Sequence, residues 1–314
     1  MTPLPVSFAW ELSAAPPERR WLIDGLWSLQ AVGIVGGEPK CCKSFLALDM
    51  AVSVASGAPC LRRFPVGLKG PVLLYCAEDA LHIVRSRLEG ICHASAVSLQ
   101  SLDLHVITAP SLRLDQAADQ LRLADTLQSL RPVLLVLDPF VRLHRIDENS
   151  SGEVAPLLAY LRDLQRRFSV SVVLVHHARK SSGHLRAGQA LRGSSEFHAW
   201  GDSNLYLRRC DDTITLTTEH RAAASLSPLT LALRSQGPHL ALELRDASPA
   251  PTAPAALSPS DKIEQALAQA TQPLPLPLLR RACRIRTAHL CSALALLTQS
   301  GRVTKTSAGY QLAL

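Results

Sequence analysis

The sequence predicts an α/β protein: a mostly parallel sheet with helices on both faces and an antiparallel extension, followed by a small separate module. Between residues 31 and 175, apolar strand-like runs alternate with helical segments, as in proteins built from βαβ units. From Ser203 onward, short strand-like runs follow one another without helices between them, which predicts antiparallel pairing. Residues 247–259 read ASPAPTAPAALSP, a composition typical of a linker, and they separate a first domain (residues 1–246) from a second one (residues 260–314).

The strands expected in the parallel sheet are mostly apolar on both faces, as strands covered by helices on both sides should be. They span residues 31–36, 71–77, 104–108, 133–137 and 170–175. The helices expected after the first four strands span residues 44–56, 79–91, 115–130 and 152–168. Sheets of this kind bind ligands beyond the carboxyl ends of their strands, so site residues are expected in the loops there.

Composition limits the class of protein. The chain has 314 residues, of which 47% are hydrophobic and 19% charged, which is enough apolar material for a sizeable core and a second, smaller domain. It has no run of about 20 apolar residues that would span a membrane, and its start lacks the pattern of a signal peptide. The eight cysteines show neither the spacing of a disulfide framework nor a CxxC zinc motif. We therefore expect a cytoplasmic protein with free thiols, no membrane partner and no zinc.

The net charge of +7 is unevenly distributed along the chain. Seven basic and two acidic residues lie from Asp261 onward, so most of the positive charge belongs to the second domain. This distribution is expected when one module binds a polyanion such as DNA and the other does not.

Residues 37–44, GEPKCCKS, lie directly after the first predicted strand and directly before the first predicted helix. This is the position of a phosphate-binding loop, because the backbone N–H groups of the loop and of the helix N-terminus together bind anions. The segment matches the pattern GxxxxGK[ST] except at Cys42, where glycine is expected. The residues expected to bind the nucleotide are Gly37, Glu38, Pro39, Lys40, Cys41, Cys42, Lys43 and Ser44.

The last two residues of this loop have specific roles in the pattern. Lys43 would contact the β and γ phosphates, and the Ser44 hydroxyl would bind Mg²⁺. A side chain at Cys42 crowds the nucleotide or strains the loop, which is compatible with slow turnover or with binding without hydrolysis. The alternative is an ordinary Gly/Pro turn with Lys43 at a solvated helix start.

A later strand supports the phosphate-site interpretation. Residues 133–138, VLLVLD, form an apolar run that ends in Asp138, typical of a Walker B strand whose carboxylate holds the water shell of Mg²⁺. Such runs are common by themselves, but this one follows a phosphate-binding loop in the same chain. Together the two segments predict that ATP and Mg²⁺ bind here.

With these motifs the sequence resembles the RecA/DnaB-type ATPases, and most closely the RepA-type hexameric plasmid replication helicase and related bacterial ATPases of the AAA type. The likeness covers about residues 21–246 and implies a RecA-like fold. In that family the second strand ends in an AED-type sequence, here CAED at residues 76–79. The resemblance implies that Glu78 is the catalytic base that polarises the attacking water. The alternative is an exposed acid at a helix start, which the helix dipole favours.

Two further segments match this family. Residues 173–180, VLVHHARK, resemble the strand in which one of two paired histidines senses the γ-phosphate, and we prefer His177 to His176. A packed histidine or a metal-binding pair is the alternative. An LRGSS segment follows a basic loop that faces DNA in relatives, so that Arg186 and Arg192 are implied DNA contacts; the alternative is a plain surface loop.

Residues 217–221, TTEHR, end a predicted strand before a loop. At this place the wider DnaB group has a basic pair that inserts into the site of the neighbouring subunit. The resemblance implies that Arg221 is an arginine finger, with His220 in place of the usual lysine. A finger of this kind stabilises phosphoryl charge across a subunit interface, so a homo-oligomer, as a ring or a filament, is expected.

The second domain is predicted to be winged-helix-like. Capping signals and apolar spacing predict helices over residues 258–270 and 277–283 and a third one capped by Thr287, followed by two short strands around a turn at Ala308 and Gly309. The candidate DNA contacts are basic residues before the third helix or in the final hairpin: Arg280, Arg281, Arg284, Arg286 and Lys305. Because the third helix itself carries no Lys or Arg, a protein-docking module is the alternative.

The sequence therefore predicts an oligomeric DNA-associated ATPase that works as a helicase or as a replication or recombination accessory. The alternative is an ATP-responsive DNA-binding regulator with little or no hydrolysis, in which Cys42 keeps turnover low. A helicase must unwind DNA, whereas a regulator needs only a nucleotide-dependent affinity for it.

Overall fold

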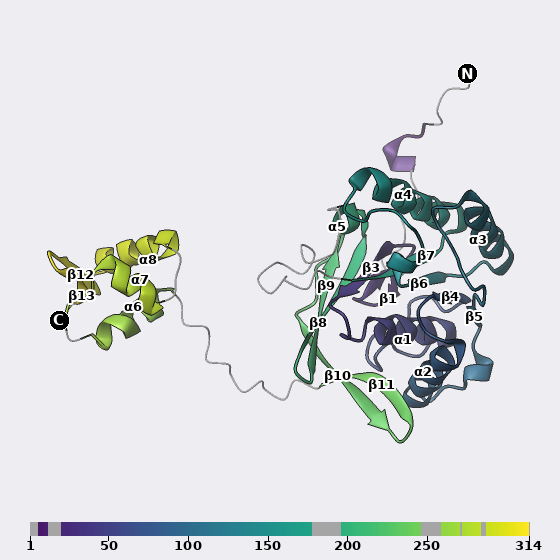
Figure 1. Cartoon of the computed structure of the whole chain (residues 1–314), viewed down its shortest axis with the longest axis horizontal. Coiled ribbons are helices and arrows are strands. Elements are labelled where there is room, and N and C mark those ends of the chain that lie inside the picture. Colours follow the sequence, from purple (N-terminus) through teal and green to yellow (C-terminus); the bar gives the residue numbers. More distant parts are fainter. Residues whose placement is uncertain are drawn as a thin grey trace. The chain divides into compact units, whose positions relative to one another are not determined.

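The structure is a computed structural model that describes residues 6–11, 20–177, 196–245, 259–270, 272–283 and 287–313. The chain divides into two compact units, Met1–Asp246 and Ala247–Leu314 (Figure 1). Each unit has its own hydrophobic core, so each is described by itself.

Nine strands of the described part of the first unit form one sheet in the order β11-β10-β9-β8-β3-β7-β6-β4-β5. The strands from β8 to β5 in this order run parallel, and β8 to β11 pair antiparallel. The parallel strands are β3 (Val32–Gly37), β4 (Val72–Cys76), β5 (Leu104–Val106), β6 (Leu134–Asp138), β7 (Ser171–His177) and β8 (Ser203–Cys210). The antiparallel extension adds β9 (Thr213–His220), β10 (Leu229–Gln236) and β11 (His239–Leu244). The predicted sheet and its extension are thus confirmed.

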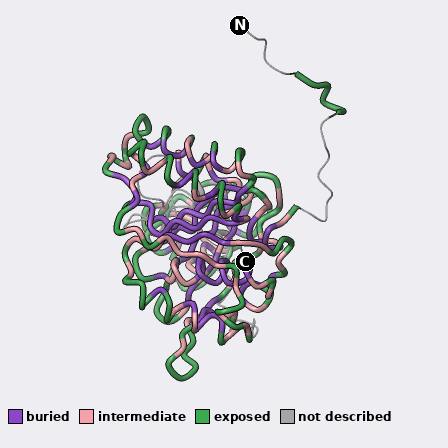
Figure 2. Tube along the Cα trace, turned by 90° about the vertical axis from the view of Figure 1, so that its right-hand side faces the viewer, coloured by how far each residue is buried: buried purple, intermediate pink, exposed green. Residues whose placement is uncertain are grey.

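Helices cover both faces of the parallel part, because neighbouring residues of the strands bury their side chains in two different cores. Val35 packs in a cluster with helices α1 and α2, whereas Ile34 packs in a second cluster with α3, α4 and α5. Figure 2 shows the resulting buried centre of the unit. The helices are α1 (Lys43–Ser56), α2 (Leu81–Ala94), α3 (Ala117–Leu130), α4 (Ser151–Phe168) and α5 (Glu196–Trp200), with single 3₁₀ turns η1 (Ala9–Glu11), η3 (Leu99–Ser101) and η4 (Phe140–Arg142).

Two local features differ from the sequence prediction. The helix expected from Asp79 begins at Leu81, which leaves Glu78 and Asp79 in an irregular segment between β4 and α2. A small hairpin of β1 (Trp21–Ile23) and β2 (Trp27–Ser28), which was not predicted, precedes β3 and buries Trp27 completely.

The second unit contains three helices and a two-stranded hairpin. They are α6 (Pro259–Ala268), α7 (Leu276–Cys283), α8 (Thr287–Gln299), β12 (Val303–Thr306) and β13 (Gly309–Leu312). Apolar residues from all three helices and from β12 form its core, including Ile263, Leu279, Leu290 and Val303. The three predicted helices and the final hairpin are therefore present, while the winged-helix assignment stays a prediction. In the residues that the structure describes, no helix combines the length and apolar character needed to cross a membrane.

Candidate nucleotide-binding site

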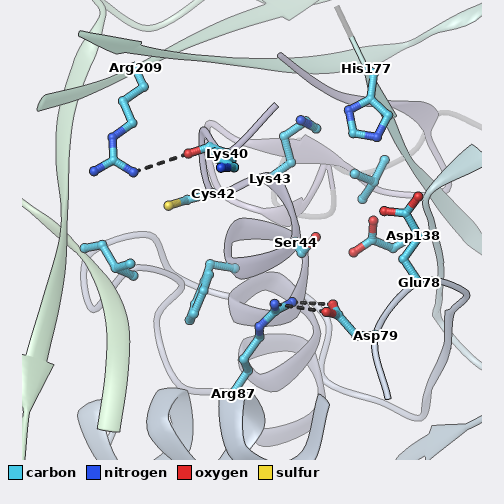
Figure 3. Close-up of a pocket in the computed structure, with 13 residues that line it drawn as sticks. Lys40, Cys42, Lys43, Ser44, Glu78, Asp79, Arg87, Asp138, His177 and Arg209 are labelled. Carbon is cyan, nitrogen blue, oxygen red and sulfur yellow. Dashed lines mark hydrogen bonds and ion pairs between the residues drawn. The ribbon is translucent and has the colours of Figure 1, made fainter. Parts of the chain in front are cut away.

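A cavity of about 420 Å³ lies at the carboxyl edge of the parallel strands of the first unit (Figure 3). Parallel strands end at one edge of their sheet, so the loops after them meet there. The loop after β3, the segment after β4 and the last residues of β6 and β7 all contribute to it. The lining residues are Lys40, Cys42, Lys43, Ser44, Phe45, Glu78, Asp79, Arg87, Asp138, Val175, His177, Arg209 and Leu233.

The predicted phosphate-binding loop connects β3 directly to α1, which begins at Lys43. Cys42 stands at the N-cap with φ 67° and ψ 28°, in the left-handed region that favours glycine. A non-glycine residue costs about 1–2 kcal/mol there. Burial raises the pKa of the Cys42 thiol, although Arg209, Arg87 and Lys43 oppose the shift. Cys42 therefore keeps the backbone geometry of the missing glycine and adds a neutral thiol to the cavity wall.

Lys43 is a nearly buried cation inside this loop. Its Nζ donates a hydrogen bond to the Glu38 carbonyl at 2.7 Å and lies 3.8 Å from the Cys41 sulfur. Burial lowers the pKa of Lys43, and the nearby Cys41 and Asp138 partly offset this effect. A buried ammonium with a lowered pKa is stabilised by an anion at its side, so the loop is suited to a phosphate group.

Ser44 and Asp138 together fit a magnesium ion. Asp138 is buried, and burial raises its pKa to about 6; Asp79 raises it further, while a hydrogen bond with Ser44 and the charge of Lys43 oppose the shift. A desolvated carboxylate beside a hydroxyl offers the oxygen ligands that Mg²⁺ prefers. A bound cation would also relieve the unfavourable burial of this charge.

The histidine pair is divided between the two faces of the sheet, because successive residues of a strand point to opposite sides. His177 lines the cavity. His176 is buried among aromatic rings, with centroids 4.4 Å from Phe197 and 6.0 Å from Phe140. The structure therefore brings His177 and not His176 to the site.

Glu78 lies on the same side of the cavity as Asp138 (Figure 3). Its Oε1 accepts a hydrogen bond from Nε of Arg142 at 2.8 Å. Arg142 belongs to η4, directly after β6, so two neighbouring strands supply the two partners. The predicted base thus reaches the cavity together with the predicted loop and metal ligands.

Two arginines of the cavity were not found from the sequence. Arg87 in α2 makes two hydrogen bonds to Asp79 and lies 5.2 Å from the Phe45 ring centroid. Arg209 in β8 donates from Nη1 to the Lys40 carbonyl at 3.3 Å. Arg87 follows Asp79 by eight residues along the chain, which is a weak signal. Arg209 has no local signal at all, because it reaches the loop only through the pairing of β8 with β3.

Arg221 lies outside the cavity of its own chain. It donates to the Ala199 carbonyl at 2.6 Å and pairs with Asp202 at 3.2 Å, while 54% of its side chain stays exposed. Asp202 also pairs with Arg162. The local contacts hold Arg221 at the surface, and its proposed role would require a neighbouring subunit.

The expected DNA contacts are only partly described. Arg280 and Arg281 are exposed in the last turn of α7, and Lys305 in β12 lies 5.8 Å from the ring centroid of Tyr310. The other expected contacts, Arg186, Arg192, Arg284 and Arg286, lie outside the described residues.

The loop at the start of α1, the carboxylate at the end of β6 and the parallel sheet that holds them define a P-loop ATPase of the RecA/DnaB type. The chain belongs to the AAA domain family, whose model matches residues 2–183. Solved structures share the fold as well. One of them is an isolated ATPase domain that is 13% identical with a TM-score of 0.50, and the match covers 69% of this chain and 85% of that one.

A second solved structure with this fold is that of a DnaB-like replicative helicase, described together with its interactions with primase. It is 12% identical with a TM-score of 0.51, and the match covers 68% of this chain. The chain matches 57% of the length of that helicase.

Proposed function

We propose that this protein is an oligomeric DNA-associated ATPase that hydrolyses Mg²⁺-ATP in the cavity at the carboxyl edge of the sheet, as a helicase or as a replication or recombination accessory. The observation that carries the proposal is the meeting of Lys43, Ser44, Asp138 and Glu78 around one cavity. The first three match what a nucleoside triphosphate and its metal need, and the fourth offers a base for water.

Each group has a distinct task in the proposed reaction. The loop and Lys43 bind the β and γ phosphates, and Ser44 and Asp138 would hold Mg²⁺, which when bound neutralises phosphate charge. Glu78 accepts a proton from the water that attacks the γ-phosphorus, while the bond from that phosphorus to the bridging oxygen of ADP breaks. His177 donates a hydrogen bond to the γ-phosphate, so that its imidazole reports whether that phosphate is present.

DNA association and oligomerisation are the finer part of the proposal. Support comes from the fold shared with a DnaB-like replicative helicase and from the exposed Arg221, which would act as a finger on a neighbouring subunit. We assign a DNA role to the second unit as a winged-helix-like module, because exposed Arg280 and Arg281 lie in its second helix. Arg186, Arg192, Arg284, Arg286 and Lys305 complete the proposed set of DNA contacts.

An ATPase assay with and without Mg²⁺ and single-stranded DNA tests the proposal. We expect Mg²⁺-dependent turnover that DNA stimulates. Lys43→Ala should abolish nucleotide binding, because the buried cation of the loop is removed, whereas Lys69→Ala should leave binding unchanged because Lys69 is exposed and outside the cavity. Unchanged nucleotide affinity in the Lys43 variant would contradict the assignment of the loop.

Cys42 favours a second candidate function, an ATP-responsive DNA-binding regulator. The thiol lines the cavity where glycine would leave the backbone open to the nucleotide. In this case ATP changes DNA affinity without appreciable hydrolysis or unwinding. DNA affinity measured with ATP and with a non-hydrolysable analogue separates the two functions: equal affinities and no turnover support the regulator.

A further inference from the structure

The backbone around Glu78 gives its side chain little support. Glu78 lies in the irregular segment between β4 and α2, and 43% of its side chain is exposed. It is also surrounded by negative charge, since the carboxylates of Asp79 and Asp138 line the same cavity. The phosphates of a bound nucleotide would repel it further. A carboxylate in this position needs a counter-charge to stay close to the reacting water.

Arg142 supplies such a counter-charge from a fixed platform. The turn η4 that carries it begins with Phe140, which is completely buried in the second core cluster. Backbone hydrogen bonds from Arg142 to Pro139 (3.1 Å) and from Leu143 to Phe140 (2.8 Å) close the turn.

The two segments are also tied to each other. The Ala77 amide donates to the Asp138 carbonyl at 2.7 Å, directly beside the ion pair. Cys76 and Asp138 are register partners in the pairing of β4 with β6. The platform therefore moves with the strand end that leads to Glu78, and the distance between Arg142 and Glu78 is set by the sheet.

We propose that Arg142 is a positioning residue that holds Glu78 in place for catalysis. This inference rests on the proposed function, because it needs Glu78 to be the base. A single hydrogen bond from Nε to Oε1 leaves Oε2 available to accept the proton of water. Arg142 does not line the cavity, so it acts through Glu78 and not on the nucleotide.

The ion pair is partly exposed, with 62% of the Arg142 side chain accessible, which limits the size of the effect. Exposed pairs contribute little, so Arg142→Ala should lower kcat about two- to fivefold while nucleotide affinity stays unchanged. Arg142→Lys should restore part of the loss, because it keeps the charge but not the planar donor group. Arg122→Ala is the matched control: Arg122 pairs with Asp119 at 2.9 Å, is 67% exposed and lies away from the cavity, and this variant should keep the wild-type kcat.

A double-mutant cycle separates the positioning role from a general effect on the fold. Rates are measured in single-turnover reactions with excess protein, which keep slow hydrolysis measurable. Arg142→Ala should have no further effect in a Glu78→Gln background, because the carboxylate that it positions is gone. An equal loss in both backgrounds, a rise in kcat, or an unchanged kcat in the Arg142 variant overturns the inference.

The same cycle distinguishes this inference from the proposed function. If Glu78→Gln alone keeps wild-type turnover, Glu78 is not the base and the proposed reaction is wrong at that step. If Glu78→Gln stops hydrolysis while Arg142→Ala does not change it, the proposed reaction stands and only the positioning role fails.

Discussion

Replacing Cys42 by glycine tests how the departure in the phosphate-binding loop affects stability and turnover. The residue has φ 67° and ψ 28°, and release of this left-handed strain should stabilise the fold by about 1–2 kcal/mol. Glycine costs about 0.5–1 kcal/mol through the greater freedom of the unfolded chain. The half-buried thiol also packs against the first core cluster, and losing about one methylene equivalent of burial costs up to roughly 0.8 kcal/mol. The free energy of unfolding should therefore change by less than about 1 kcal/mol.

Turnover should stay the same or rise, because removal of the side chain lets the loop backbone approach the phosphates. The assay is steady-state hydrolysis at saturating Mg²⁺-ATP together with thermal unfolding. Ala96→Gly is the matched control, since Ala96 has φ 53°, is exposed and lies outside the cavity, so it reports strain release without a change at the site. A fall in the turnover of Cys42→Gly with an intact fold would refute the reasoning and show that the loop depends on the thiol.

Three further predictions follow from other parts of the molecule. Arg221→Ala should lower turnover about 10³-fold without changing nucleotide affinity, as for other arginine fingers. Mixing it with Lys43→Ala subunits should restore partial activity, and an inactive mixture despite subunit exchange would contradict a role in trans. Removing residues 247–314 should leave a folded, nucleotide-binding core but weaken DNA binding and its salt dependence in anisotropy titrations, because fewer counterions are released; an unchanged salt slope would assign this unit to protein docking. Burial lowers the pKa of His220, so the folded state keeps this imidazole neutral and stability should decrease as the pH falls from about 7 towards 5. Denaturant unfolding at several pH values should show a smaller decrease for His220→Gln than for wild type, whereas the exposed His198 offers a control variant with an unchanged slope.

Much of the fold was predictable because its elements have strong local patterns. The strand β6 is an uninterrupted apolar run, and the loop before α1 follows a known phosphate-binding pattern, so both were found close to their actual bounds. The antiparallel extension was also expected from short strands without helices. The hairpin of β1 and β2 was missed, since strands of three and two residues carry too little periodicity to be recognised.

The candidate site was predictable only in part, for the same reason. Lys43, Ser44 and Asp138 stand in motifs that are read along the chain. Arg209 and Arg142 stand in no motif, and their relation to the site depends on which strands are neighbours in the sheet.

The sequence by itself determined the α/β class, the two-unit organisation and the phosphate-binding loop with its cysteine, because each depends on residues that are close together in the chain. Only the tertiary structure decided which of two adjacent histidines faces the cavity, and which arginines contact the loop and Glu78. His177 lines the cavity because of the pleat and position of β7, and Arg209 lies 169 residues from the carbonyl that it binds. Contacts between such distant residues arise from strand pairing and from packing on both faces of the sheet, and no local sequence pattern specifies them.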